Sequence, residues 1–293
     1  MKQNATNIHR YGRPFLFTIL FAAFCVTTGF IFATDAGGHS QDNQSPHSPA
    51  WLQLEIDKQK QRLSSTDLDE RRDAVMRLGL LHRAEASRAV LPALTDPFPM
   101  IRATAANALS SLPPQESASA LIPLLGDNDE FVRQQVAYAL GEMKNRAAVA
   151  ALVERLETDK LDSVRSAAAV ALGQIGDESA VVALAGVLSS RDAAQGGKKR
   201  KWKNSEFVLR AAARSLGEIG SRAGVPVLID ALSNESVAGD VRREAARALG
   251  LIGDPVAVPT LRSAVGAPDV YLSQLAGESL RKIASRAGTP SLR

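Results

Sequence analysis

The residue types that most often carry catalysis are sparse in the periodic part of this chain. His82 is the only histidine after residue 47, and Glu85 follows it three residues later. A histidine and a glutamate this close could act as a general base with its partner, or as two metal ligands. The spacing does not match the H-E-x-x-H zinc motif, so we interpret His82 as a solvated turn residue. We expect no catalytic residue, no cofactor and no metal site, which favours a non-enzymatic role without deciding it.

A second group with chemical potential is the basic cluster KKRKWK, which comprises Lys198, Lys199, Arg200, Lys201, Trp202 and Lys203. Five cations beside an indole could contact anionic lipid or nucleic acid, and the alternative is a solvated loop. The formal net charge of +4 is concentrated here and at the N-terminus. Because ranks of Lys and Arg are absent from the inner helices that we predict below, nucleic-acid binding is disfavoured.

The N-terminal segment predicts a membrane anchor. Residues 14–33 carry no charge, and they follow Lys2, Arg10 and Arg13 but precede Asp35. A stretch of this length can span the hydrocarbon core, and the positive flank stays in the cytoplasm. We therefore expect residues 1–13 to be cytoplasmic and the rest of the chain to be extracytoplasmic, which means periplasmic in a bacterium.

The alternative is a signal peptide cut after Ala33 or Ala36, which would make the protein secreted. Residues 34–50 are polar and rich in Gly, Ser and Pro, and we interpret them as a flexible linker. His39 and His47 lie in this linker and are interpreted as solvated.

The elements that position these groups are predicted by an internal repeat. Aligning the chain on the Gly of Ala-Leu-Gly gives Gly79, Ser110, Gly141, Gly173, Gly217, Gly250 and Arg281. The spacing is 31 to 33 residues except for one interval of 44, which indicates an insertion at about 189–204. Apolar pairs four residues apart recur after each Gly, so each unit should contain two helices, as in a stacked solenoid.

Local signals agree with this division. Gly176, Gly220 and Gly253 should end first helices in the left-handed conformation, and the next residue in each case can cap the second helix. Pro92 and Pro123 should kink their second helices. Runs of alanine give the first helices small side chains, so that the first helices of successive repeats can pack closely.

Arginines recur eight residues before the Gly, and aspartates recur six residues before three of them. The arginines are Arg71, Arg102, Arg133, Arg165 and Arg242, and the aspartates are Asp96, Asp127 and Asp159. An Asp–Arg ladder along the stack is the interpretation that we favour over a binding role.

The phrase DSVRSAAAVALGQIGD, followed in later units by VPxL, resembles HEAT repeats of the short type found in phycobilisome lyases, over about residues 70–284. The resemblance implies an all-α fold, a superhelical α-solenoid of about seven two-helix repeats in residues 51–293. The uncharged segment 14–33 places one transmembrane helix before it. Residues 50–64 should cap its start. The module serves lyases, a hydroxylase and many scaffolds, so the resemblance implies no single function. The hydroxylases of this fold need His-Glu pairs, and this chain has no His-Glu dipeptide.

Two function classes remain. The first is a membrane-tethered scaffold whose second helices line a concave face for a protein or peptide partner. Positions thirteen and fourteen after each Gly should be exposed there, and the predicted contact residues are Leu124, Glu154, Arg155, Val187 and Asp230. The second is a lyase-like enzyme or enzyme subunit whose active residues the sequence does not identify.

Overall fold

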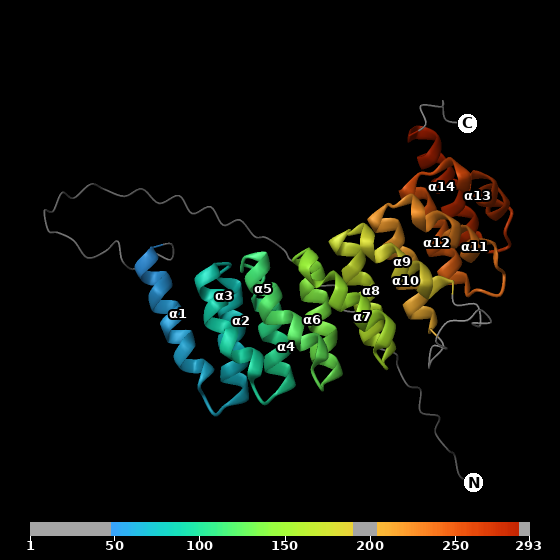
Figure 1. Ribbon diagram of the computed structural model, residues 1–293. Helices are drawn as coiled ribbons and strands as arrows, with labels where there is room; N and C mark the ends of the chain where they lie inside the picture. The colour runs from blue at the N-terminus through green and yellow to red at the C-terminus, as the bar shows by residue number, and fades with distance from the viewer. Residues whose placement is uncertain (1–47, 190–203, 287–293) are drawn as a thin grey trace, which may run out of the picture. The chain divides into compact units, whose positions relative to one another are not determined.

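The computed structural model describes residues 48–189 and 204–286, and every regular element in these ranges is a helix (Figure 1). The predicted span 14–33 and the basic cluster 198–203 lie outside these residues. Among the helices of the two described ranges, none combines the length and the apolar character that a membrane crossing requires.

The first helices of the repeats form one layer, in which each helix packs on the next. They are α2 (Leu68–Leu80), α4 (Pro99–Ala108), α6 (Glu130–Glu142), α8 (Asp162–Ile175), α10 (Glu206–Ile219), α12 (Gly239–Ile252) and α14 (Val270–Arg286). Their order along the stack follows their order in the sequence (Figure 1). The all-α solenoid is confirmed, and the described residues contain six complete repeats and the first helix of a seventh.

The second helices form the other layer, and each is joined to a short 3₁₀ segment. They are α3 (Ala84–Val90) with η2 (Leu91–Thr95), α5 (Pro114–Leu121) with η3 (Ile122–Gly126), η4 (Arg146–Ala148) with α7 (Val149–Thr158), η5 (Glu178–Ala180) with α9 (Val181–Leu188), η6 (Arg222–Gly224) with α11 (Val225–Ser233), and η7 (Pro255–Ala257) with α13 (Val258–Val265). Helix α1 (Pro49–Leu63) packs on α2 and α3, which confirms the predicted capping helix. The side chain of Ser48 caps α1, so the folded domain begins slightly earlier than Trp51.

One continuous core runs through the stack between the two layers. The leucine that precedes each aligned position is fully buried in six repeats, as Leu78, Leu109, Leu140, Leu172, Leu216 and Leu249. Burial of one such side chain contributes about 1.5–3 kcal/mol, so the column is a large part of the stacking energy.

The predicted helix ends are confirmed. Gly176, Gly220 and Gly253 have φ of 71°, 76° and 79°. The structure adds that His82 and Lys144 hold the same position in earlier repeats with φ of 49° and 50°, which costs a residue with a Cβ about 1–2 kcal/mol. The predicted caps Asp177, Ser221 and Asp254 accept hydrogen bonds from backbone N–H groups two residues on.

The two early prolines change the type of helix. After Val90 and Leu121 the second helices continue as the 3₁₀ segments η2 and η3, with Pro92 and Pro123 near their starts. Since proline lacks the N–H that an α-helical turn would use, the chain tightens at these points. The predicted kink therefore takes the form of an α to 3₁₀ transition.

The close spacing of the first helices depends on their glycines as well as their alanines. A Cβ added at Gly217 would lie 2.7 Å from the Cα of Ala248 on the next first helix. At Gly141 it would lie 2.7 Å from the Cα of Ala171, and at Gly79 it would lie 3.2 Å from the Cα of Ala108. These glycines therefore permit backbone-to-backbone approach between successive repeats.

Candidate functional site

The outer face of the second helices, which we call the second-helix face, was predicted to expose two adjacent positions in each repeat. The position thirteen residues after the aligned Gly is exposed in all six repeats, as Pro92, Pro123, Glu154, Gly186, Asp230 and Ser263. The next position is buried or half-buried, as Ala93, Leu124, Arg155, Val187, Ala231 and Ala264. One step along a helix turns the side chain by about 100°, which carries the second position toward the core.

Val187 is the clear correction among the predicted contact residues. Its side chain is fully buried, and its backbone carbonyl accepts a hydrogen bond from Asn204 Nδ2 at 3.1 Å. It supports the core and cannot touch a partner on the second-helix face. Val187 is apolar, as a contact residue on this face was expected to be, but it lies on the side of α9 that faces the core.

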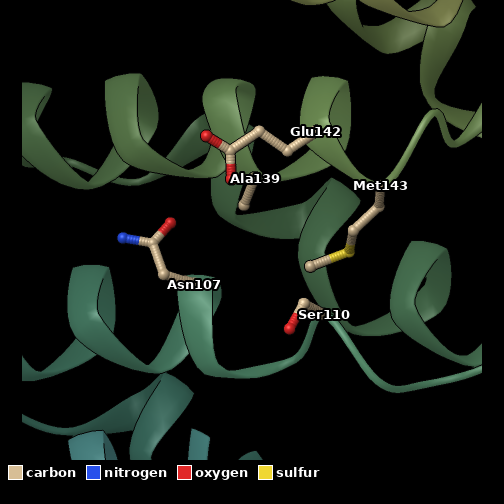
Figure 2. Close-up of a pocket in the computed structure, with 5 residues that line it drawn as sticks. All are labelled: Asn107, Ser110, Ala139, Glu142 and Met143. Carbon is tan, nitrogen blue, oxygen red and sulfur yellow. The ribbon is translucent and has the colours of Figure 1, made fainter. Parts of the chain in front are cut away.

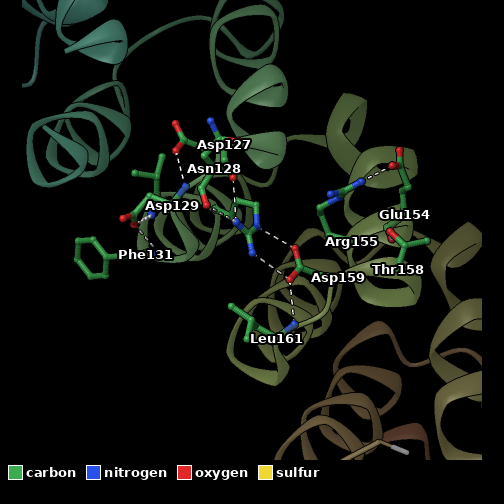
Figure 3. Close-up of polar contacts among 11 residues, drawn as sticks. Asp127, Asn128, Asp129, Phe131, Glu154, Arg155, Thr158, Asp159 and Leu161 are labelled. Carbon is green, nitrogen blue, oxygen red and sulfur yellow. Dashed lines mark hydrogen bonds and ion pairs between the residues drawn. The ribbon is translucent and has the colours of Figure 1, made fainter. Parts of the chain in front are cut away.

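Glu154 and Arg155 lie on α7 and form an ion pair with each other (Figure 3). Glu154 is exposed and Arg155 is half-buried. An exposed pair of this kind contributes only about 0–1 kcal/mol to folding, so its charges remain available to orient a partner. Asp230 is exposed on α11, and Leu124 lines a shallow hollow of about 490 Å³ together with Pro123, Asp96 and Asp127.

The predicted Asp–Arg ladder is present for the arginines of the first three repeats. The Nε atoms of Arg71, Arg102 and Arg133 donate to carboxylate oxygens of Asp96, Asp127 and Asp159, each at 2.8 Å. Arg102 and Arg133 also donate through Nη1 to the backbone carbonyls of Asp96 and Asp127 at 2.8 Å. Asp96 and Asp127 thus each join the arginines of two successive repeats. Figure 3 shows Asp127 and Asp159 along this line.

Hydrogen bonding governs the protonation of the central carboxylate of this ladder. Burial raises the pKa of Asp127, but hydrogen bonds from Arg102 and from the backbone N–H of Asp129 outweigh this effect. The net result is a pKa below the usual value for aspartate, because both partners favour the charged form. The carboxylate acts as a structural link between repeats, since both of its oxygens are already occupied.

The ladder changes at the insertion. Arg165 is fully buried and donates to Asn204 Oδ1 at 3.0 Å, so an amide takes the place of the next aspartate. Beyond this point Arg243, one residue after the predicted Arg242, pairs with Asp269 at 2.9 Å. Arg242 instead donates to the carbonyl of Leu232. The sequence analysis missed Asp269, although its position at the entry of a first helix was a usable signal.

The remaining sites of chemical interest offer little for catalysis. A small cavity of about 100 Å³ between α4 and α6 is lined by Asn107, Ser110, Ala139, Glu142 and Met143 (Figure 2). Glu142 is the only titratable group among these lining residues. His82 is exposed in its turn. Within residues 48–189 and 204–286, no three His, Cys, Asp or Glu side chains come together as a metal site.

Comparisons with known proteins bear on the architecture. The family model described as HEAT repeats matches residues 56–140, 119–195 and 203–292. A search of curated proteins finds no match. Among solved structures, the chain is similar to YibA of Escherichia coli, with 18% identity, a TM-score of 0.53, and coverage of 79% of this chain and 81% of that chain.

Two enzymes of related architecture show weaker structural similarity. The complex of CpcE and CpcF of phycocyanin lyase from Nostoc sp. gives 23% identity, a TM-score of 0.46, and coverage of 85% and 92% of the two chains. Human deoxyhypusine hydroxylase in complex with glycerol gives 21% identity, a TM-score of 0.40, and coverage of 84% and 94%. At these identities the likeness concerns the fold alone.

Proposed function

Because this chain belongs to the HEAT-repeat proteins, we propose that it is a scaffold that holds a protein or peptide partner on its second-helix face. The observation that carries the proposal is the row at position thirteen, which is exposed in register in all six complete repeats. Its residues are small or uncharged apart from Glu154 and Asp230. Such a row offers shape and modest apolar contact, which suits a polypeptide better than a phosphate backbone.

The partner would lie along the middle of this face. Leu124 supplies an apolar contact beside the shallow hollow. Glu154 and Arg155 supply charges on α7, and Asp230 supplies a charge on α11, two repeats further along the stack. Charges at the rim of an interface mainly set orientation and association rate. We expect micromolar binding, which corresponds to about −8 kcal/mol.

The proposal is tested with a photo-crosslinking residue placed at Glu154 or at Asp230 in the full chain. Both positions should capture the same partner, and the control position Glu142, which is exposed at the end of the first helix α6, should not. Combining Leu124→Asp with Glu154→Arg and Arg155→Glu should abolish capture through Asp230. Unchanged capture by this folded triple variant would show that the second-helix face is not the binding surface.

We also propose that the scaffold is tethered to a membrane by residues 14–33 with its repeats outside the cytoplasm. The charge asymmetry around this segment supports the orientation. Alkaline phosphatase fused after residue 50 should be active, and the protein should resist carbonate extraction. An inactive fusion would indicate the opposite orientation. Release of the protein by carbonate would indicate that residues 14–33 are a cleaved signal peptide.

The basic cluster 198–203 is proposed to contact anionic lipid headgroups near such a membrane. Its five cations and Trp202 are the sequence features that support this role. Neutralising the cations should weaken binding to phosphatidylserine vesicles, and the effect should fade at high salt. If the neutralised variant bound vesicles as strongly as the unmodified protein, the proposal would be refuted.

A further inference from the structure

The repeat stack has two edges, formed by the turns at the two ends of the first helices, and these edges differ in charge. The turns that precede each first helix comprise, within the described residues, 64–70, 95–100, 126–131, 158–163, 204–207, 233–240 and 266–271, and we call this surface the acidic edge. The basic cluster 198–203 belongs to the same connection as 204–207, but it lies outside the described residues. Its exposed carboxylates are Asp67, Asp69, Glu70, Glu130, Glu206 and Glu235, and Lys160 is the only lysine within these ranges. At the opposite ends of the first helices, acidic and basic residues nearly balance.

The acidic edge also carries a row of exposed apolar side chains. These are Phe98, Met100, Phe131, Leu161, Phe207 and Tyr271, with Phe207 and Tyr271 being 66% and 69% exposed. Every aromatic side chain that is exposed within the described residues lies in this row. Figure 3 shows Phe131 pointing away from the helices beside Asp129, with Leu161 on the next turn.

Packing inside the protein accounts for only part of this row. The guanidinium groups of Arg71, Arg210 and Arg243 lie 5.3, 5.6 and 5.4 Å from the ring centroids of Phe98, Phe207 and Tyr271. These contacts cover one side of each ring and leave the rest in water. The row contains every exposed aromatic side chain of the described residues, whereas the exposed apolar side chains elsewhere, such as Leu80, Val182 and Val256, are aliphatic. Exposed aromatic side chains that gather in one strip are typical of an interaction surface.

The Asp–Arg ladder holds the strip in register. Ion pairs and hydrogen bonds connect the successive turns, from Arg71 with Asp96 to Arg243 with Asp269. The hydrogen bond from Arg165 to Asn204 continues this series of contacts between the turns on either side of the insertion. The apolar side chains are therefore presented at the spacing of packed helices, which is about 8–10 Å.

We propose that the acidic edge binds a cationic polypeptide segment in an extended conformation, with an apolar side chain at about every third residue. The spacing follows from the polyproline II form of an extended chain, which has three residues per turn and a rise of about 3.1 Å per residue. Every third side chain then lies on one face at intervals of about 9 Å, against the 8–10 Å between helices. The carboxylates of the edge select Lys and Arg at the intervening positions by charge complementarity. The shallow hollow lined by Pro97, Asp127 and Asn128 borders the same edge and can take part of the segment.

This surface is distinct from the second-helix face, and its chemistry is different. The second-helix row is small and weakly charged, whereas the acidic edge combines aromatics with carboxylates.

The test uses the full chain and a fluorescent peptide that repeats Phe-Lys-Arg, with anisotropy as the readout. The double variant Phe131→Ser with Phe207→Ser should weaken binding by about tenfold or more, as expected for the loss of two aromatic anchors. A matched control, Val182→Ser with Val256→Ser, removes two side chains that are 83% and 68% exposed outside the edge and should leave binding unchanged.

Three further peptides define the chemistry. Peptides that repeat Ser-Lys-Arg or Phe-Glu-Asp should bind at least about tenfold more weakly, because each lacks one of the two required features. A peptide with the same composition but with its Phe residues adjacent should also lose affinity. Equal binding of the Phe-Lys-Arg peptide to the edge and control variants would overturn the proposal, as would edge-dependent binding to phosphatidylserine vesicles without binding to the peptide.

Discussion

Substitution of Gly217 by alanine separates two effects that the sequence alone cannot distinguish. Gly217 lies within α10, where alanine is a better helix former than glycine by about 0.8–1.0 kcal/mol. By helix propensity alone, Gly217→Ala should stabilise the protein. The structure predicts the reverse, because the new Cβ would lie 2.7 Å from Ala248 Cα and 2.8 Å from Ala248 Cβ.

The magnitude follows from the packing of α10 against α12. A carbon pair needs about 3.5–4.0 Å, so the helices must separate by roughly 1 Å, and overpacking of a filled core typically costs about 1–3 kcal/mol. After the propensity gain is subtracted, we expect a net loss of up to about 2 kcal/mol. Because one clashing atom is the backbone Cα, adding Ala248→Gly should not restore stability.

The chain offers a matched control in Gly277, inside α14. A Cβ there would meet only Arg281 Nη1 at 3.8 Å, so Gly277→Ala should gain about 0.8–1.0 kcal/mol. Gly79→Ala, with 3.2 Å to Ala108 Cα, should fall between the two. Urea unfolding followed by circular dichroism measures all three. If Gly217→Ala were as stabilising as Gly277→Ala, close backbone approach would not govern the stacking of repeats.

Three further experiments test the turns, the ladder and the core. Lys144→Gly should raise the free energy of unfolding by up to about 1 kcal/mol, because Lys144 has φ of 50°. Gly176→Ala should lower it by about as much, because Gly176 has φ of 71°. If both variants changed the free energy of unfolding in urea by the same amount and in the same direction, the left-handed backbone would not be the source of strain. Asp127 has a lowered pKa in the folded state, so its contribution is complete above the unfolded value near 3.9 and is lost as pH falls below it. Asp127→Asn should therefore make Tm fall less steeply as the pH drops below about 4, and an unchanged slope would exclude this carboxylate as the cause. Leu172→Ala should cost about 2–5 kcal/mol, while Leu80→Ala, at a side chain that is 70% exposed, should cost less than about 0.5 kcal/mol.

The sequence predicted the repeat architecture well because its signals are local and recur. The buried leucine column, the left-handed glycines and the capping residues each repeat at a fixed offset, so an error in one unit is corrected by the others. The ladder between Arg102 and Asp127 was predictable for the same reason. The close approach at Gly217 was not predicted, because it depends on which residue of the next helix faces the glycine.

The interaction surfaces were harder to predict because exposure depends on helical phase. Val187 and Gly186 are neighbours in sequence, yet the first is fully buried and the second is exposed. A phase error of one residue reverses the assignment, and the Leu pattern alone does not fix it. The exposed aromatic row was not predicted for another reason. Phe131 and Phe207 lie in the first turns of their helices next to buried valines, and the sequence does not distinguish an exposed apolar residue there from a buried one.

The insertion shows how the stack tolerates an irregular unit. Helices α8 and α10 pack together as closely as other first helices, although the segment between α9 and α10 is the longest connection in the domain. Asn204 makes this possible, because it accepts from Arg165 in the ladder and donates to the carbonyl of Val187 at the end of α9. One amide thus closes the base of the insertion by linking three helices.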